Sequence, residues 1–93
     1  MIDAREVAER LVYVFCNEES KEKTGKDIAT LVGAADFLDK APIDLAYPAM
    51  YPKELLNMHS ETLRMVATGR NVSADRVDMC YKFLNDMAEK NYS

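Results

Sequence analysis

Apolar residues recur through most of this 93-residue chain at the three- and four-residue spacing that places side chains on one face of a helix. Each stretch with this pattern starts at or just after a residue that suits a helix N-terminus. The predicted helices cover residues 4–17, 24–40, 52–68 and 74–90. The chain contains only 3 glycines and 3 prolines, which suits a few helices better than many short strands. The sequence therefore predicts an all-α fold.

We expect a small four-helix bundle that forms a single helical domain over residues 1–93. The first and second helices would form one helical hairpin, and the third and fourth helices would form another. Residues 41–52 would join the two hairpins, and they hold all three prolines. Within this Pro-rich connector, Pro42 suits the start of a fifth, short helix that ends at Leu45.

The helix over residues 24–40 is the least polar of the four, because no charged residue lies between Ile28 and Ala35. Thr24 is the expected N-cap, and Asp27 lies where its carboxylate can reach back to the free amides. The expected buried stripe contains Ile28, Leu31, Val32, Ala35 and Leu38. A helix this apolar is either the central element of a bundle or a subunit interface.

The third helix also carries a wide apolar surface, since two neighbouring faces of it are rich in leucine, methionine and valine. A four-helix monomer does not readily cover two such helices. The pattern therefore predicts self-association, with a homodimer formed through the second or the third helix.

The net charge of −4 disfavours non-specific nucleic-acid binding, which depends on an excess of basic residues. No apolar run approaches the roughly 20 residues that span a bilayer, so no membrane partner is expected. The first residues are charged and do not resemble a signal peptide. Cys16 and Cys80 lie far apart in the sequence and are expected to be free thiols, which suits a cytoplasmic location.

Known catalytic and metal-binding patterns are missing from the sequence. His59 is the only histidine, and no acidic residue lies one helical turn away from it. The carboxylate pairs Asp36 with Asp39 and Asp75 with Asp78 fall on polar helical faces, and the sequence shows neither the burial nor the close partner that an acid or base catalyst needs. Neither cysteine belongs to a zinc-binding motif. We expect no catalytic residue, no metal site and no cofactor, and hence a protein that is not an enzyme.

Residues 66–84 nevertheless contain a pattern with a known function. Ala67, Asn71 and Val77 have the spacing of the alanine, the turn glycine and the buried valine of a helix-turn-helix. The segment resembles the helix-turn-helix of bacterial DNA-binding proteins, and Arg70 stands where that pattern prefers an apolar residue. This resemblance implies a transcriptional regulator that binds DNA through residues 66–84.

In this alternative, the DNA-binding residues would be Arg70, Arg76 and Lys82. Asp75 and Asp78 would lie on the same recognition helix, where a carboxylate opposes phosphate groups and most base edges. The DNA-binding function therefore requires that the three basic residues point outward and that the two aspartates are buried.

The preferred interpretation is a small acidic cytoplasmic protein that acts by binding another protein, as an adaptor, an inhibitor or an accessory factor of bacterial or phage type. Tyrosine is a frequent contact residue in protein interfaces. The candidate partner-binding residues are Tyr13, Tyr47 and Tyr51. Exposure of these side chains would favour protein binding, whereas a pocket lined by His59 would favour catalysis.

Overall fold

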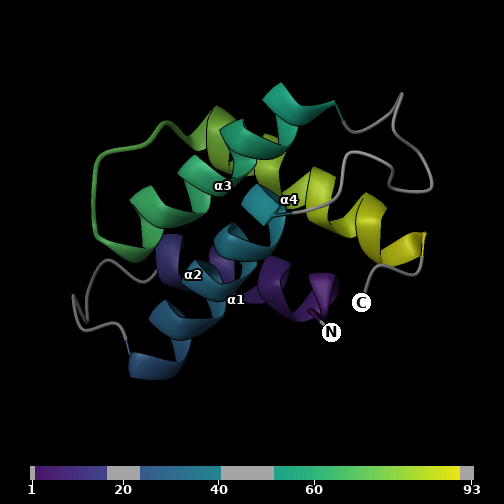
Figure 1. The fold of residues 1–93 in the computed structure, drawn as a ribbon. Helices are drawn as coiled ribbons and strands as arrows, with labels where there is room; N and C mark the ends of the chain where they lie inside the picture. The colour runs from purple at the N-terminus through teal and green to yellow at the C-terminus, as the bar shows by residue number, and fades with distance from the viewer. Residues whose placement is uncertain (1, 17–23, 41–51, 91–93) are drawn as a thin grey trace.

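The computed structural model describes residues 2–16, 24–40 and 52–90, which form four α-helices and no strand. In chain order these are α1 (Ala4–Cys16), α2 (Gly25–Lys40), α3 (Lys53–Ala67) and α4 (Ala74–Glu89) (Figure 1). The predicted all-α fold is confirmed, and each end lies within one residue of its predicted position. The short helix expected at Pro42 to Leu45 lies outside the described residues.

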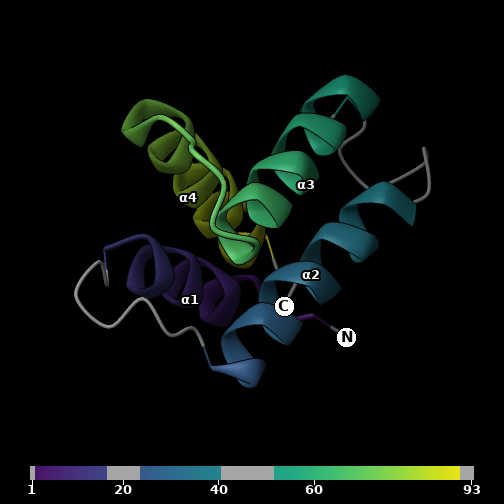
Figure 2. The same cartoon turned by 90° about the vertical axis from the view of Figure 1, so that its left-hand side faces the viewer.

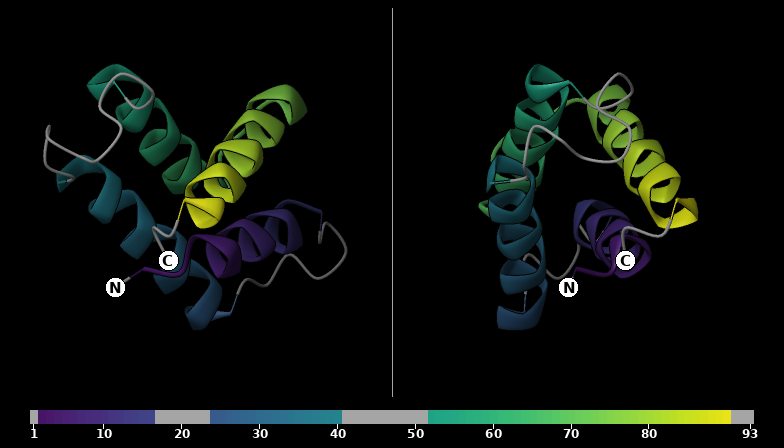
Figure 3. Two further views of the ribbon diagram at one scale, coloured as in Figure 1. Left: turned by 90° about the vertical axis from the view of Figure 1, so that its right-hand side faces the viewer. Right: turned by 45° about the vertical axis from the view of Figure 1, so that its right-hand side comes forward.

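The helices pair differently from the two expected hairpins. The most extensive contacts join α2 to α3 and α1 to α4. In each of these pairs the two helices run in opposite directions (Figure 1). The helices α3 and α4 follow each other in the sequence, but they are strongly inclined and share only a small contact area (Figure 2 and Figure 3).

The helix α2, which the sequence favours as the central element of the bundle, is less central than α1 and α3. Over their described lengths, α1 and α3 each contact all three other helices, whereas α2 contacts only α1 and α3. The inner face of α1 consists of alanine, valine and leucine, whose side chains let neighbouring helices approach closely. Its buried residues are Ala4, Val7, Ala8, Leu11 and Val14.

The helix α2 begins with a reciprocal cap between Thr24 and Asp27. The Asp27 amide donates to Thr24 Oγ1 at 3.1 Å, and the Thr24 amide donates to Asp27 Oδ2 at 3.2 Å. The hydroxyl of Thr24 also donates to Asp27 Oδ2 at 2.7 Å. The other oxygen, Asp27 Oδ1, accepts from Arg10 Nη1 at 2.8 Å. The predicted cap is confirmed, and it also forms the polar link between α1 and α2.

Burial of Asp27 sets the rotation of α2 about its own axis. The side chain of Asp27 is 1% exposed, and the buried side of α2 continues through Leu31, Ala34, Ala35 and Leu38. Consecutive helical residues are about 100° apart, so the neighbouring Ile28 turns away from the core. Ile28 is 38% exposed, and its predicted place in the core is wrong.

The contact between α2 and α3 combines apolar packing with a cluster of polar side chains. Arg64 forms ion pairs with both Asp36 and Asp39. Ser60 Oγ donates to Asp39 Oδ1, and Lys53 Nζ donates to the Asp39 carbonyl oxygen at 2.6 Å. Ser60 is buried, because its side of α3 lies against the end of α2.

One hydrophobic core joins all four helices. The helices α3 and α4 each contribute a stripe of buried residues to it, and these are Leu56, His59, Leu63, Val66, Val77, Cys80, Phe83, Leu84 and Met87. None of the helices within the described ranges is both long enough and apolar enough to cross a lipid bilayer.

Replacing Asp27 with asparagine should lower the free energy of unfolding by about 1–3 kcal/mol, because the variant weakens the cap and leaves Arg10 without its counter-charge. Urea denaturation at neutral pH measures this change. The matched control is Asp36→Asn, the same substitution at an exposed carboxylate of the same helix, where a loss of at most about 1 kcal/mol is expected. Equal losses in both variants would contradict a special role for Asp27.

The effect of Asp27→Asn should also depend on pH. The hydroxyl of Thr24, its amide and Arg10 together hold the pKa of the Asp27 carboxyl below its ordinary value of 3.8. The stability that this carboxylate contributes is therefore complete above that value and is lost as the pH falls through the lower folded-state pKa. The difference between wild type and variant should shrink below about pH 4.

Candidate binding groove

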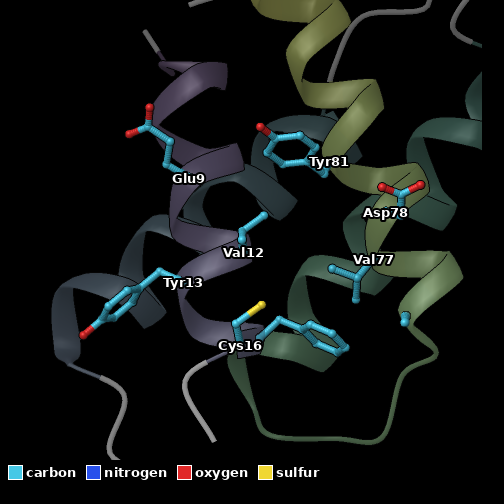
Figure 4. Close-up of a pocket in the computed structure, with 9 residues that line it drawn as sticks. Glu9, Val12, Tyr13, Cys16, Val77, Asp78 and Tyr81 are labelled. Carbon is cyan, nitrogen blue, oxygen red and sulfur yellow. The ribbon is translucent and has the colours of Figure 1, made fainter.

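A groove with a volume of about 580 Å³ lies between α1 and α4. The two helices are antiparallel, so the C-terminal half of α1 faces the N-terminal half of α4. Figure 4 shows Val12 and Cys16 of α1 pointing toward α4, and Val77 and Tyr81 of α4 pointing toward α1. The described residues that line the groove are Glu9, Val12, Tyr13, Phe15, Cys16, Ala74, Val77, Asp78 and Tyr81.

The two walls of the groove have the same helical spacing. Along α1 the lining residues at i, i+3, i+4 and i+7 are Glu9, Val12, Tyr13 and Cys16. Along α4 the residues at the same four steps are Ala74, Val77, Asp78 and Tyr81. Each helix therefore contributes one stripe of about two turns. Seven residues at 1.5 Å per residue give the groove a length of about 10 Å.

Most of the groove surface is apolar. Val77 is buried and forms part of its floor, while Phe15 and Tyr81 are half-buried. Val12 is 38% exposed and points toward α4, whereas Tyr13 is 53% exposed and its ring points away from α4 (Figure 4). Tyr13 thus has the exposure expected of a partner-binding residue. Tyr47 and Tyr51, the other two candidates, lie outside the described residues.

The charged residues of the groove are all acidic. Among the described lining residues, Glu9 on α1 and Asp78 on α4 are the only two that carry a charge. Asp78 forms an ion pair with Lys82 on its own helix at 2.9 Å, and both side chains are exposed. An exposed pair of this kind contributes little and is easily exchanged for another partner. The groove thus combines apolar walls with one carboxylate from each helix.

His59 belongs to the core. It is 2% exposed, it stacks on Phe83 with ring centroids 4.3 Å apart, and it does not line the α1/α4 groove. Its Nδ1 atom has no hydrogen-bond partner within the described residues. Burial, together with the nearby charge of Arg76, lowers the pKa of His59 to about 4. The imidazole is therefore neutral at physiological pH and packs as an aromatic ring.

The other titratable candidates lack the features of catalytic groups. The Ser60 hydroxyl and Arg64 hold the pKa of the Asp39 carboxyl below its ordinary value, which makes it a weaker base. Burial raises the pKa of the Cys80 thiol to about 12, so it does not form a thiolate nucleophile at neutral pH. Within the described part of the chain, no three histidine, cysteine or carboxylate side chains gather as a metal site would require.

The connection between α3 and α4 differs from the turn of a helix-turn-helix. Residues 68–73 separate the two helices, whereas a helix-turn-helix uses three or four residues. The left-handed residue is Gly69, with φ of 75°, two positions before the expected Asn71. The Gly69 amide donates to Val66 O at 3.2 Å, and the Arg70 amide donates to Met65 O at 2.8 Å. These two bonds form a Schellman cap that ends α3.

The side chains proposed to contact DNA are not arranged as that function requires. Arg70 and Lys82 are exposed, but Arg76 turns toward α3, where its Nε donates to Thr62 Oγ1 at 2.7 Å. Asp75 and Asp78 are exposed instead of buried. The recognition face therefore presents both carboxylates to solvent, and its geometry lends no support to the DNA-binding alternative.

The stability of the protein should fall by on the order of 3 kcal/mol between pH 6.5 and pH 4 because of His59. The unfolded chain binds a proton at this histidine below pH 6.5, whereas the folded protein resists protonation until about pH 4. Chemical denaturation across this range should show the decrease in wild type. The variant His59→Phe keeps a ring against Phe83 and should show a flatter profile; an unchanged profile would contradict this assignment.

The two cysteines should differ sharply in their reaction with Ellman's reagent. Both are free thiols, but Cys16 is exposed at the end of α1 and Cys80 is fully buried. We expect Cys16 to react in the native protein and Cys80 to react only after denaturation. The variant Cys16→Ala should lose the native reaction. Rapid reaction of Cys80 in that variant would contradict the packing of α4.

Comparisons with protein-family models, with curated proteins and with solved structures found no match to this chain.

Proposed function

We propose that this protein acts by binding another protein and that the α1/α4 groove is the contact site. The observation that carries the proposal is the pair of matching two-turn stripes, which leave Val12 and Tyr13 exposed beside a buried apolar floor. Concave apolar surfaces with polar rims are typical of interaction sites, because a partner gains free energy by covering them. Tyrosine is among the residues that contribute most to such contacts.

The composition of the groove supports a protein partner over a small molecule. Small-molecule sites fix their ligand with a few polar groups that converge on it. Here the two charged lining residues, Glu9 and Asp78, come from the walls of an otherwise apolar groove. A partner side chain that fills the groove would bury Val12 while its polar neighbours stay near these carboxylates.

The role proposed is that of an adaptor, inhibitor or accessory factor in the cytoplasm. Cys16 and Cys80 are free thiols, and Cys16 is exposed, which suits a reducing compartment. A bacterial or phage origin stays a prediction from the size and acidity of the chain.

A homodimer is a second candidate, and the outward face of α2 favours it. Ile28 is 38% exposed, and the exposed Ala29 and Gly33 lie on the same side of α2. These small residues border a shallow hollow of about 320 Å³ between α1 and α2. Two copies could bring their α2 helices together there, because small side chains permit a close approach.

Site-specific photo-crosslinking tests the proposed contact site. A benzophenone amino acid in place of Tyr13 should crosslink a distinct protein in the cells that produce this chain. The matched control is the same replacement at Met79, which is 52% exposed and does not line the groove. Equal products from both positions, or no protein product at position 13, would overturn the proposal.

The crosslinked partner should then be purified and its affinity measured by calorimetry. We expect Val12→Asp to weaken binding by at least about 2 kcal/mol, because it places a charge on the apolar wall. Ile28→Asp makes the same change at a residue of equal exposure on α2 and should leave the affinity unchanged. In light scattering, a native dimer that Ile28→Asp converts to a monomer would support the homodimer instead.

A further inference from the structure

We infer that the occupant of the α1/α4 groove is an amphipathic helix of the partner protein, with lysine or arginine residues beside its apolar face. This inference rests on the proposed function, and it adds the conformation and the charge of the segment that binds. Three features of the groove carry it, namely the nature of its walls, its length and the sign of its charged residues.

The nature of the walls favours a helix over an extended strand. A strand binds by pairing its backbone with the free edge of a sheet. Both walls here are α-helices, whose backbone groups at the groove already bond within each helix. The partner must therefore be recognised through side chains, as when an amphipathic helix lies in a groove between two helices.

The length of the groove fits two turns of a helix. Glu9 and Cys16 mark the ends of the stripe on α1, and Ala74 and Tyr81 mark the ends on α4. The resulting length of about 10 Å equals the rise between residues i and i+7 of a helix. Apolar side chains at i, i+4 and i+7 of the partner would therefore enter the groove together.

The charges of the groove favour a basic segment. Glu9 lies on one wall and Asp78 on the other, so a helix between them has a carboxylate on each side. The whole chain also carries a net charge of −4, which favours the approach of a cationic partner. Lysine or arginine at the borders of the apolar face would reach these carboxylates while its carbon chain covers the edge of the groove.

Selection from a displayed peptide library tests the inference. The library holds helix-forming peptides about four turns long, with randomised positions that encode lysine, glutamate and apolar residues equally often. Selection uses the native protein, and peptides that also bind Val12→Asp are removed. We expect the enriched peptides to have apolar residues at i, i+4 and i+7 and an excess of basic residues beside them. A synthetic peptide with an enriched sequence should slow the reaction of Cys16 with Ellman's reagent.

Charge reversal then tests the role of the two carboxylates. The double variant Glu9→Lys with Asp78→Lys should bind the enriched basic peptide at least about tenfold more weakly. The control is Glu54→Lys with Glu89→Lys, which changes the net charge equally at exposed positions away from the groove. The control should lose much less affinity.

Three results would overturn the inference. One is that the selected peptides are acidic or lack helical spacing, and another is that no peptide binds the native protein without also binding Val12→Asp. The third is equal affinity of the enriched peptide for the Glu9/Asp78 and the Glu54/Glu89 double variants. These results leave the proposed function intact where position 13 still crosslinks a protein partner. Loss of that crosslink as well would show that the groove is not a protein-binding site.

Discussion

The packing of the bundle depends on the buried contact between Asp27 and Arg10. Burying a carboxylate is costly unless its oxygens are satisfied. Both oxygens of Asp27 are satisfied here, because Thr24 bonds to one and Arg10 to the other. The same carboxylate thus caps α2, attaches it to α1 and fixes which side of α2 faces the core. Its burial turns Ile28 outward and gives α2 an exposed apolar face.

The position of α1 explains why a groove forms. Its inner stripe, with Leu11 and Val14, contacts the other helices, while Val12 lies at the edge that faces the groove and Tyr13 faces outward. The helix α4 packs against α1 more than against α3, and it covers only one edge of this outer stripe. A pair of inclined helices leaves an apolar surface between them that a third helix would normally cover in a larger bundle.

The chemistry of the chain is consistent with recognition by shape and charge. Its sole histidine, His59, and one of its two cysteines, Cys80, are core residues. Burial lowers the pKa of His59 and raises the pKa of Cys80, and each shift favours the neutral side chain. The carboxylates Asp36 and Asp39 are bound by Arg64 and join α2 to α3. Glu9 and Asp78, the latter in an exposed ion pair with Lys82, lie at the groove, where an acidic rim beside apolar walls can select a partner.

The sequence by itself determined the local structure of this protein. The spacing of apolar residues and the cap at Thr24 predicted the four helices and their ends. Such features depend on residues within a few positions of each other, so they can be read from the chain. The groove could be predicted only in part, since Tyr13 is the one lining residue that the sequence proposed as a partner contact.

Only the tertiary structure decided how the helices pair, that Arg10 forms its ion pair with Asp27, and which stripe of α4 completes the groove. An apolar stripe specifies that a helix has a buried face, but many neighbours can cover it at similar cost. The partners of polar side chains such as Arg10 and Arg76 lie on other helices, so they depend on how the helices pack. The binding surface is therefore a property of the assembled bundle.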